Sequence, residues 1–233
     1  MNPTRIEWCQ MTWNPIVGCS KRCHDEHGKI WCYAYWQAKR MKQKCDLCYK
    51  FVPHIHEERL MEPYERKKPT NIFVCSMGEF FDPCVPQAWR DKILKVVEDN
   101  QQHRFMFLTK QPQNIKKMTY PKNMWIGISL TGKNDTITEE QILHLINDLK
   151  EDVVVKFLSL EPYMKKVDGS IIALFDWIIV GGKTGHEPFT PPKEWVDPIV
   201  EWSRYMKRPL FIKSNCKYPA TIKQHPGGEN NGN

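Results

Sequence analysis

The chain has 233 residues, of which 41% are hydrophobic and 12% aromatic, so it carries enough apolar surface for one large domain or two small ones. We expect one domain over residues 1–224, which includes a Cys-rich insertion at 19–60, and a disordered tail over 225–233. No apolar run approaches the roughly 20 residues that span a bilayer, and no apolar signal segment begins the chain. These features argue against a membrane-spanning or secreted protein, and we expect a cytoplasmic protein with no membrane partner.

The nine cysteines and the net charge of +7 narrow the protein class further. An odd cysteine count without a signal segment predicts reduced thiols, some of them bound to metal, rather than a disulfide framework. The C-terminal segment between Glu201 and Glu229 contains no acidic residue. Its cations alternate with aromatic residues, namely Arg204, Tyr205, Lys207, Arg208, Phe211, Lys213, Lys217, Tyr218 and Lys223. Such a region fits a nucleic acid partner through its phosphate backbone, or else a solvated protein face.

Apolar runs and punctuating residues predict alternating strands and helices after an irregular N-terminal segment over 1–18. Strands are expected at 71–75, 104–108, 124–130, 153–158, 176–180 and 209–212. Helices are expected at 33–44, at 85–102, after Thr138 and within 192–206. Thr138 and Gln141 fit a capping box, whereas Pro198 either begins the last helix or bends it.

This alternation predicts an α/β fold of mostly parallel strands. The strand count permits either a partial (β/α) barrel or an open doubly wound sheet. In both folds, ligands bind at the carboxyl ends of the parallel strands. Position alone therefore selects a set of candidate ligand-binding residues at those ends, namely Lys110, Ser129, Glu161, Gly181, Gly182 and Lys213.

The densest chemical signal lies near the N-terminus, where three cysteines share one short segment. Cys19, Cys23 and Cys32 are spaced C-x3-C-x8-C, and the cations Lys21 and Arg22 favour thiolates. Several thiolates in one loop are typical of metal and iron–sulfur sites. The spacing is unusual for zinc, which generally uses one close pair of ligands followed by a second pair.

The motifs around these cysteines resemble the phage- and prophage-associated three-cysteine family of radical-SAM-like proteins. The residues that carry the resemblance are Ile6-Glu7-Trp8, Thr12-Trp13-Asn14-Pro15, Gly18-Cys19, Cys23 and Cys32-Tyr33-Ala34. That family has two residues between the second and third cysteines, whereas this chain has eight, from His24 to Trp31. Two doublings of this loop raise its closure cost by only about 1.2 kcal/mol, so the three thiols can still converge.

The resemblance implies a radical-SAM-like partial barrel and a radical SAM enzyme. Cys19, Cys23 and Cys32 would hold a 4Fe-4S cluster, and the remaining iron would bind S-adenosylmethionine. An electron donor protein would then supply the reductant. The pair Gly78-Glu79 matches a turn whose polar groups accept the amino group of the methionine moiety.

Further strand ends complete the expected cofactor-binding set. Glu161 and the Gly181-Gly182 turn match other segments of the same family, and Ser129 shares their position by strand order. Lys183 departs from the family, which commonly has Glu there. The basic C-terminal segment and a second basic run over 39–50, together with the phage association, favour nucleic acid or a modified base as the substrate.

A second group of potential metal ligands lies downstream of the three cysteines. Cys45 and Cys48 form a C-x2-C pair, and His54 and His56 lie six and eight residues beyond it. With one or both histidines, or with an upstream cysteine, this pair predicts a second metal site that suits zinc. The pattern supports an alternative function, that of a non-enzymatic zinc-stabilised nucleic-acid-binding protein. Both interpretations hold together if a cluster occupies one site and zinc the other.

Overall fold

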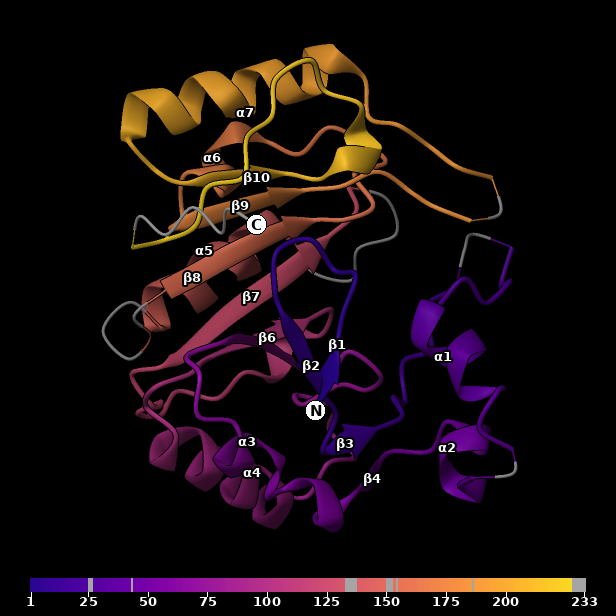
Figure 1. Ribbon diagram of the computed structural model, residues 1–233. Helices are drawn as coiled ribbons and strands as arrows, with labels where there is room; N and C mark the ends of the chain where they lie inside the picture. Colours follow the sequence, from indigo (N-terminus) through magenta and orange to yellow (C-terminus); the bar gives the residue numbers. More distant parts are fainter. Residues whose placement is uncertain are drawn as a thin grey trace. The chain divides into compact units, whose positions relative to one another are not determined.

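The computed structural model describes residues 1–24, 27–42, 44–132, 138–149, 153, 155–185 and 187–227 (Figure 1). Contacts divide the chain into two compact units, Met1–Met124 and Trp125–Asn233. Each unit combines parallel strands with helices. The α/β class and the mostly parallel strands are therefore confirmed, while barrel closure and a single domain stay predictions.

The first unit contains short strands and helices around a small sheet. Its strands are β1 (Asn2–Pro3), β2 (Met11–Trp13), β3 (Ile16–Val17), β4 (His54–Ile55), β5 (Asn71–Val74) and β6 (Arg104–Thr109). Its helices are α1 (Tyr33–Ala38), α2 (Asp46–Lys50), α3 (Glu62–Glu65) and α4 (Gln87–Asp99), with 3-10 turns η1 (Glu57–Arg59) and η2 (Pro112–Asn114). Strand neighbours follow the order β1-β2-β5-β6. Because β2, β5 and β6 pair in parallel, the segments that follow them leave from one edge of the sheet.

The prediction of only irregular structure before Gly18 is wrong. Met11, Thr12 and Trp13 form β2, and all three side chains are buried. The Trp13 ring lies 5.7 Å from the Phe105 ring of β6, centroid to centroid, in an edge-on arrangement. A three-residue strand that is covered on both faces shows no alternation of apolar and polar residues, so its sequence carries no strand signal.

The helix predicted over 33–44 is also wrong in its second half. Helix α1 ends at Ala38, after which Met41 N–H donates to the Ala38 carbonyl and Cys45 N–H to that of Met41. These single turns lead the chain into α2, a helix that was not predicted from the sequence. Lys39 Nζ fixes this connection by donating to the Tyr49 carbonyl at 2.8 Å.

The second unit is a parallel sheet with helices that connect its strands. Its strands are β7 (Met124–Leu130), β8 (Val155–Leu160), β9 (Trp177–Val180) and β10 (Leu210–Ile212). Its helices are α5 (Glu139–Asp148), α6 (Gly169–Ile172) and α7 (Lys193–Met206), with a 3-10 turn η3 (Ser214–Cys216). Neighbouring strands follow the order β7-β8-β9-β10 and all pairs are parallel.

The two faces of this sheet carry different side chains. One face packs against α5, α6 and α7 in a single apolar cluster that includes Leu158, Ile178 and Leu210. On the other face, the Trp177 ring lies within 6.4 Å, centroid to centroid, of each of four aromatic rings, those of Trp125, Phe157, Phe211 and His225. His225, where the predicted tail begins, is therefore buried, and residues 228–233 of that tail lie outside the described residues. Strands covered on both faces explain why the sequence shows apolar runs rather than alternation.

The starting residues of three helices depend partly on local sequence and partly on packing in the core. The capping box is confirmed, because Thr138 Oγ1 accepts from Gln141 N–H at 3.2 Å and the Gln141 side chain accepts from Thr138 N–H at 2.9 Å. Helix α4 begins after Pro86, which is its N-cap. Helix α7 begins at Lys193, so the alternative that it begins at Pro198 is wrong. Pro198 is an interior residue of α7, and burial of Val196, Ile199 and Val200 in the core stabilises the helix on both sides of it.

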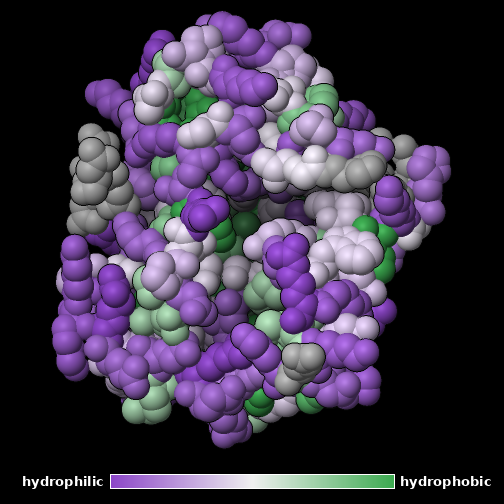
Figure 2. All heavy atoms as spheres, turned by 45° about the vertical axis from the view of Figure 1, so that its right-hand side comes forward, coloured by the Kyte–Doolittle hydropathy of each residue, from purple (hydrophilic) through white to green (hydrophobic). Residues whose placement is uncertain are grey.

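The face shown in Figure 2 is mostly hydrophilic, and its purple side chains surround small green groups of apolar residues. In the part of the chain that the structure describes, no helix combines the length and apolar character needed to cross a membrane.

Candidate functional site

The loop that carries Cys19, Cys23 and Cys32, here called the three-cysteine loop, begins where two parallel backbone segments of the first unit approach each other closely. Gly18 N–H donates to the Met77 carbonyl at 3.0 Å, and Gly18 forms a parallel bridge with Gly78. A Cβ on Gly78 would lie 2.8 Å from the Ile16 carbonyl oxygen, and one on Gly18 would lie 2.4 Å from the Val52 carbonyl. Both positions need glycine because backbone approaches so closely, and Gly18 also has a φ of +97°. Gly78 therefore places the turn after β5 beside Cys19.

The thiols of this loop lie close enough to influence one another. Cys32 donates a hydrogen bond to Cys23, which lowers the pKa of Cys23 and raises that of Cys32. The charge of Cys19 further raises the pKa of Cys32. Cys32 also caps α1, because its sulfur accepts a hydrogen bond from Tyr35 N–H at 3.5 Å. Burial raises the pKa of Cys19 to about 12, and the Glu79 charge adds to this effect. The structure thus places Cys23 and Cys32 in contact and Cys19 within electrostatic range of Cys32, whereas their binding of one cluster stays a prediction. Residues 25–26 of the connecting loop lie outside the described residues.

Glu79, the residue predicted to bind the cofactor amino group, is buried beside Cys19. Its carboxylate accepts from Phe81 N–H at 3.0 Å and from Lys110 N–H at 3.3 Å, and the Thr109 hydroxyl also donates to it. Burial nevertheless dominates and raises the pKa of Glu79 to about 7. This carboxyl group is poised to gain a proton or a cationic partner near neutral pH.

Asp82 is a second buried carboxylate near the loop, and it was not among the predicted site residues. Its Oδ2 accepts from Ser20 N–H at 2.6 Å and from the Ser20 hydroxyl at 2.8 Å, while Oδ1 accepts from Cys84 N–H at 2.8 Å. Burial alone would raise the pKa of Asp82, but these hydrogen bonds outweigh it and hold the pKa below its ordinary value. The ionised Asp82 therefore anchors the turn between Cys19 and Cys23.

Residues after β6 complete the surroundings of the loop. Gln111 Nε2 lies 3.7 Å from Cys19 Sγ and 3.4 Å from Asp82 Oδ2. Lys21 Nζ donates to the Lys110 carbonyl at 2.9 Å. Lys110 was predicted from its position at a strand end, whereas Gln111 was missed, although the same strand-end rule would have selected it.

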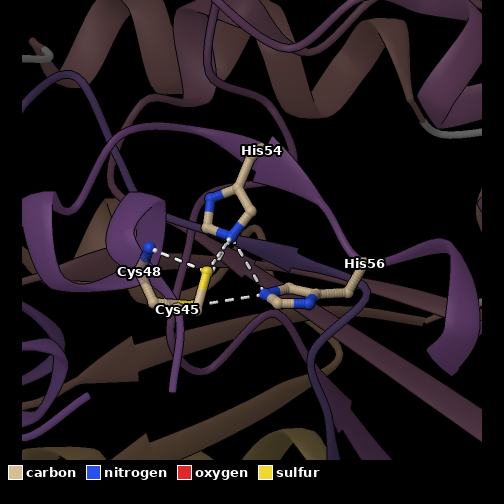
Figure 3. A group of neighbouring side chains, drawn as sticks. All are labelled: Cys45, Cys48, His54 and His56. Atoms are coloured by element: carbon tan, nitrogen blue, oxygen red, sulfur yellow. Dashed lines mark hydrogen bonds between the residues drawn. The ribbon is translucent and has the colours of Figure 1, made fainter. Parts of the chain in front are cut away.

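The second group of potential metal ligands comes together at one place in the described part of the chain. Cys45, Cys48, His54 and His56 each offer one ligand atom, and these atoms all lie within 4.8 Å of one another (Figure 3). His54 Nε2 lies 3.5 Å from Cys45 Sγ and 3.4 Å from Cys48 Sγ. His56 Nε2 lies 3.2 Å from Cys48 Sγ and 2.9 Å from His54 Nε2. This group could hold a metal ion, and both histidines belong to it rather than an upstream cysteine.

Candidate residues of the second unit also meet, at the carboxyl ends of its strands. Lys213 Nζ forms an ion pair with the Glu161 carboxylate, and a Cβ on Gly181 would touch both side chains at 3.0 Å. The Ser129 hydroxyl donates to the Glu161 carbonyl at 3.5 Å. Gly182, the last candidate, is held by an unpredicted partner: Gly182 N–H donates to Asn215 Oδ1 at 3.0 Å, and Asn215 Nδ2 returns a bond to its carbonyl at 2.8 Å.

The basic C-terminal segment is partly engaged within its own unit. Arg208 pairs with Asp176 at 2.5 Å, and Phe211 is buried against Trp177. Tyr205, by contrast, is 85% exposed. A nucleic acid partner for this segment stays a prediction.

Comparison with known proteins adds a family but no activity. A family model described as "Protein of unknown function (DUF5131)" matches residues 3–233. The chain belongs to this family. No curated protein and no solved structure matches it. In this DUF5131 chain the match extends over both units, so the three-cysteine loop, the Cys45 group and the Glu161 cluster all fall within the family region.

Proposed function

We propose that this DUF5131 protein is a radical SAM enzyme whose 4Fe-4S cluster is held by Cys19, Cys23 and Cys32. The observations that carry the proposal are the hydrogen bond between Cys32 and Cys23 and the electrostatic coupling of Cys19 to Cys32 and to Glu79, at the sheet edge where β2 and β5 end. Ligands bind at this edge of parallel α/β sheets, because the following loops converge there. The chemistry that the bound cluster would supply is a one-electron cleavage of the S–C5′ bond of S-adenosylmethionine, giving methionine and a 5′-deoxyadenosyl radical that takes hydrogen from the substrate.

The donor set suits such a cluster. Three soft thiolates match iron–sulfur chemistry, and each would bind a different iron. Cys23 already has a lowered pKa, and iron would offset the burial that keeps Cys19 protonated. Gln111 Nε2, 3.7 Å from Cys19 Sγ, would donate a hydrogen bond to the bound thiolate.

Glu79 would receive the amino group of S-adenosylmethionine. Its raised pKa reports a carboxylate whose ionised form is poorly compensated in its buried setting. An ammonium group would supply the missing positive charge and would hold Glu79 ionised. Asp82, whose ionised state is already satisfied by Ser20 and Cys84, instead fixes the shape of the loop.

Formation of 5′-deoxyadenosine tests this proposal. The anaerobically reconstituted protein is incubated with a low-potential reductant and S-adenosylmethionine, and 5′-deoxyadenosine is quantified by mass spectrometry. We expect product from the wild type and from Cys84→Ala, which alters an exposed cysteine, and none from Cys32→Ala. A wild type that carries about four irons per chain yet yields no 5′-deoxyadenosine would contradict the proposal.

A zinc-stabilised nucleic-acid-binding protein is the second candidate, and the Cys45 group favours its metal half. Its nucleic acid half has weaker support, since Arg208 is paired and Phe211 faces the core. The second candidate also gives no role to the buried Glu79. We therefore propose the enzyme, with nucleic acid or a modified base as the substrate class.

A further inference from the structure

We infer that Cys45, Cys48, His54 and His56 bind one structural zinc ion, which fastens the segment on which the three-cysteine loop rests. The inference does not depend on an iron–sulfur cluster. It rests on the geometry of the four side chains, on the groups behind them and on what the segment supports.

The spacing of the four ligand atoms fits a tetrahedral ion. With Zn–S near 2.3 Å and Zn–N near 2.0 Å, a regular tetrahedron separates sulfur from nitrogen by about 3.5 Å, and the two nitrogens by about 3.3 Å. The three sulfur–nitrogen separations given above are 3.5, 3.4 and 3.2 Å, and the two nitrogens are 2.9 Å apart. Small outward shifts of the side chains would therefore bring these separations to the tetrahedral values.

Each histidine ring is oriented by a hydrogen bond at Nδ1, the nitrogen that faces away from the other ligands, as is usual in metal sites. His54 Nδ1 lies 2.8 Å from the Val52 carbonyl oxygen, and His56 Nδ1 lies 2.7 Å from Glu58 Oε1. These acceptors fix each Nδ1 as the protonated nitrogen, so each Nε2 presents its lone pair to the ion. The Cys48 N–H also donates to Cys45 Sγ at 3.3 Å and would stabilise a thiolate there.

The ligand chemistry selects zinc and a structural role. Two thiolates and two neutral imidazoles balance the charge of a divalent ion and prefer tetrahedral zinc. All four positions are supplied by protein, so no position remains for a substrate or a water. A closed site of this kind contributes folding energy rather than catalysis.

The segment needs such a clamp because its own secondary structure is short. Helices α1 and α2 have six and five residues, far below the length at which an isolated helix is stable in water. Strand β4, which carries His54, pairs with β3, and Gly18 abuts the Val52–Pro53 backbone. An ion that joins α2 to β4 would thus hold the surface against which Gly18, and hence Cys19, is placed.

Zinc content and cobalt spectroscopy test the inference. We expect about one zinc per chain in the wild type and in the matched controls Cys84→Ser and His144→Gln, and its loss in Cys45→Ser and His56→Gln. Cys32→Ala should keep its zinc even where iron is lost, which separates this inference from the proposed function. Zinc that persists unchanged in both ligand variants would overturn it.

Two further measurements do not depend on a ligand variant folding. Cobalt(II) added to chelator-treated wild type should give thiolate-to-cobalt charge-transfer bands and the strong visible bands of a tetrahedral ion, and zinc should abolish them; weak octahedral bands without a thiolate band would refute the site. Glu58→Ala changes only an exposed carboxylate behind His56 and should weaken zinc affinity about 10- to 100-fold. Glu57→Ala, whose carboxylate pairs with Lys92, should not. Equal affinities in these two variants would also count against the inference.

Discussion

Replacing Glu79 with Gln should remove a cost of folding that grows as the pH rises. The folded pKa of about 7 lies above the ordinary value of 4.5, so the protonated carboxyl stabilises the folded state relative to the unfolded one. This contribution is complete below about pH 4.5 and is lost as the pH rises through about 7. The amide that replaces the carboxyl in Glu79→Gln cannot ionise, and the variant should lack this dependence.

The size of the effect follows from the two pKa values. Between pH 5 and pH 8 the wild type should lose about 2–3 kcal/mol of unfolding free energy relative to Glu79→Gln. For a chain of this length, each kcal/mol shifts the melting temperature by about 2–4 °C, so the gap between the two proteins should change by about 5–10 °C. The absolute stability of the variant will also reflect the introduced amide, which meets the Lys110 N–H as a second donor, and only the change with pH isolates the ionisation.

The assay is thermal unfolding followed by circular dichroism at about pH 5 and about pH 8, on protein that carries no iron–sulfur cluster and no S-adenosylmethionine. Asp82→Asn is the matched control, because the lowered pKa of Asp82 keeps it ionised throughout this range. That variant should be less stable than the wild type and should keep most of its pH dependence, reduced only because the Asp82 charge helps to raise the pKa of Glu79. If the melting temperature of Glu79→Gln changes with pH as much as that of the wild type, the pKa of Glu79 is not raised in the folded state.

Three other substitutions probe the supports of the two units by thermal unfolding and metal content. Gly18→Ala forces a Cβ to within 2.4 Å of Val52 at a φ of +97° and should lower both the melting temperature and the zinc content; unchanged zinc would separate Gly18 from the clamp. Asn14→Ala removes the acceptor for Met77 N–H at 2.8 Å and should lower the free energy of unfolding by about 1–3 kcal/mol. A melting temperature that falls by less than about 1 °C would be evidence against that hydrogen bond. Lys213→Met should destabilise by about 1–2 kcal/mol, and the added Glu161→Gln should restore part of the loss if the pair is coupled.

Local patterns predicted those features whose causes are local in the sequence. The Thr138–Gln141 capping box spans three residues and was confirmed in detail. The Cys45, Cys48, His54 and His56 set spans twelve residues, and its spacing predicted the cysteine pair with the histidines or an upstream cysteine as its partners. The fold brings both histidines to the pair. The α/β class followed from apolar runs that are buried on both faces of parallel strands.

Features that depend on distant partners could not be read in this way. Asp82 is joined to Ser20, 62 residues away, and Asn215 to Gly182, 33 residues away. A single Asp or Asn in a loop carries no trace of such a partner. The extent of β8 shows the same limit: its strand was expected to end at 158, but parallel pairing with β7 continues it to Leu160.

We propose that this chain holds two different metals at two separate sites. Iron, sulfide and zinc are quantified on the same anaerobic samples of wild type, Cys19→Ala and Cys45→Ser. We expect about four irons and about one zinc per wild-type chain, loss of iron with zinc retained in Cys19→Ala, and loss of zinc in Cys45→Ser. Zinc alone in the wild type, with no iron taken up on reconstitution, would contradict the iron–sulfur enzyme and leave a zinc-stabilised protein.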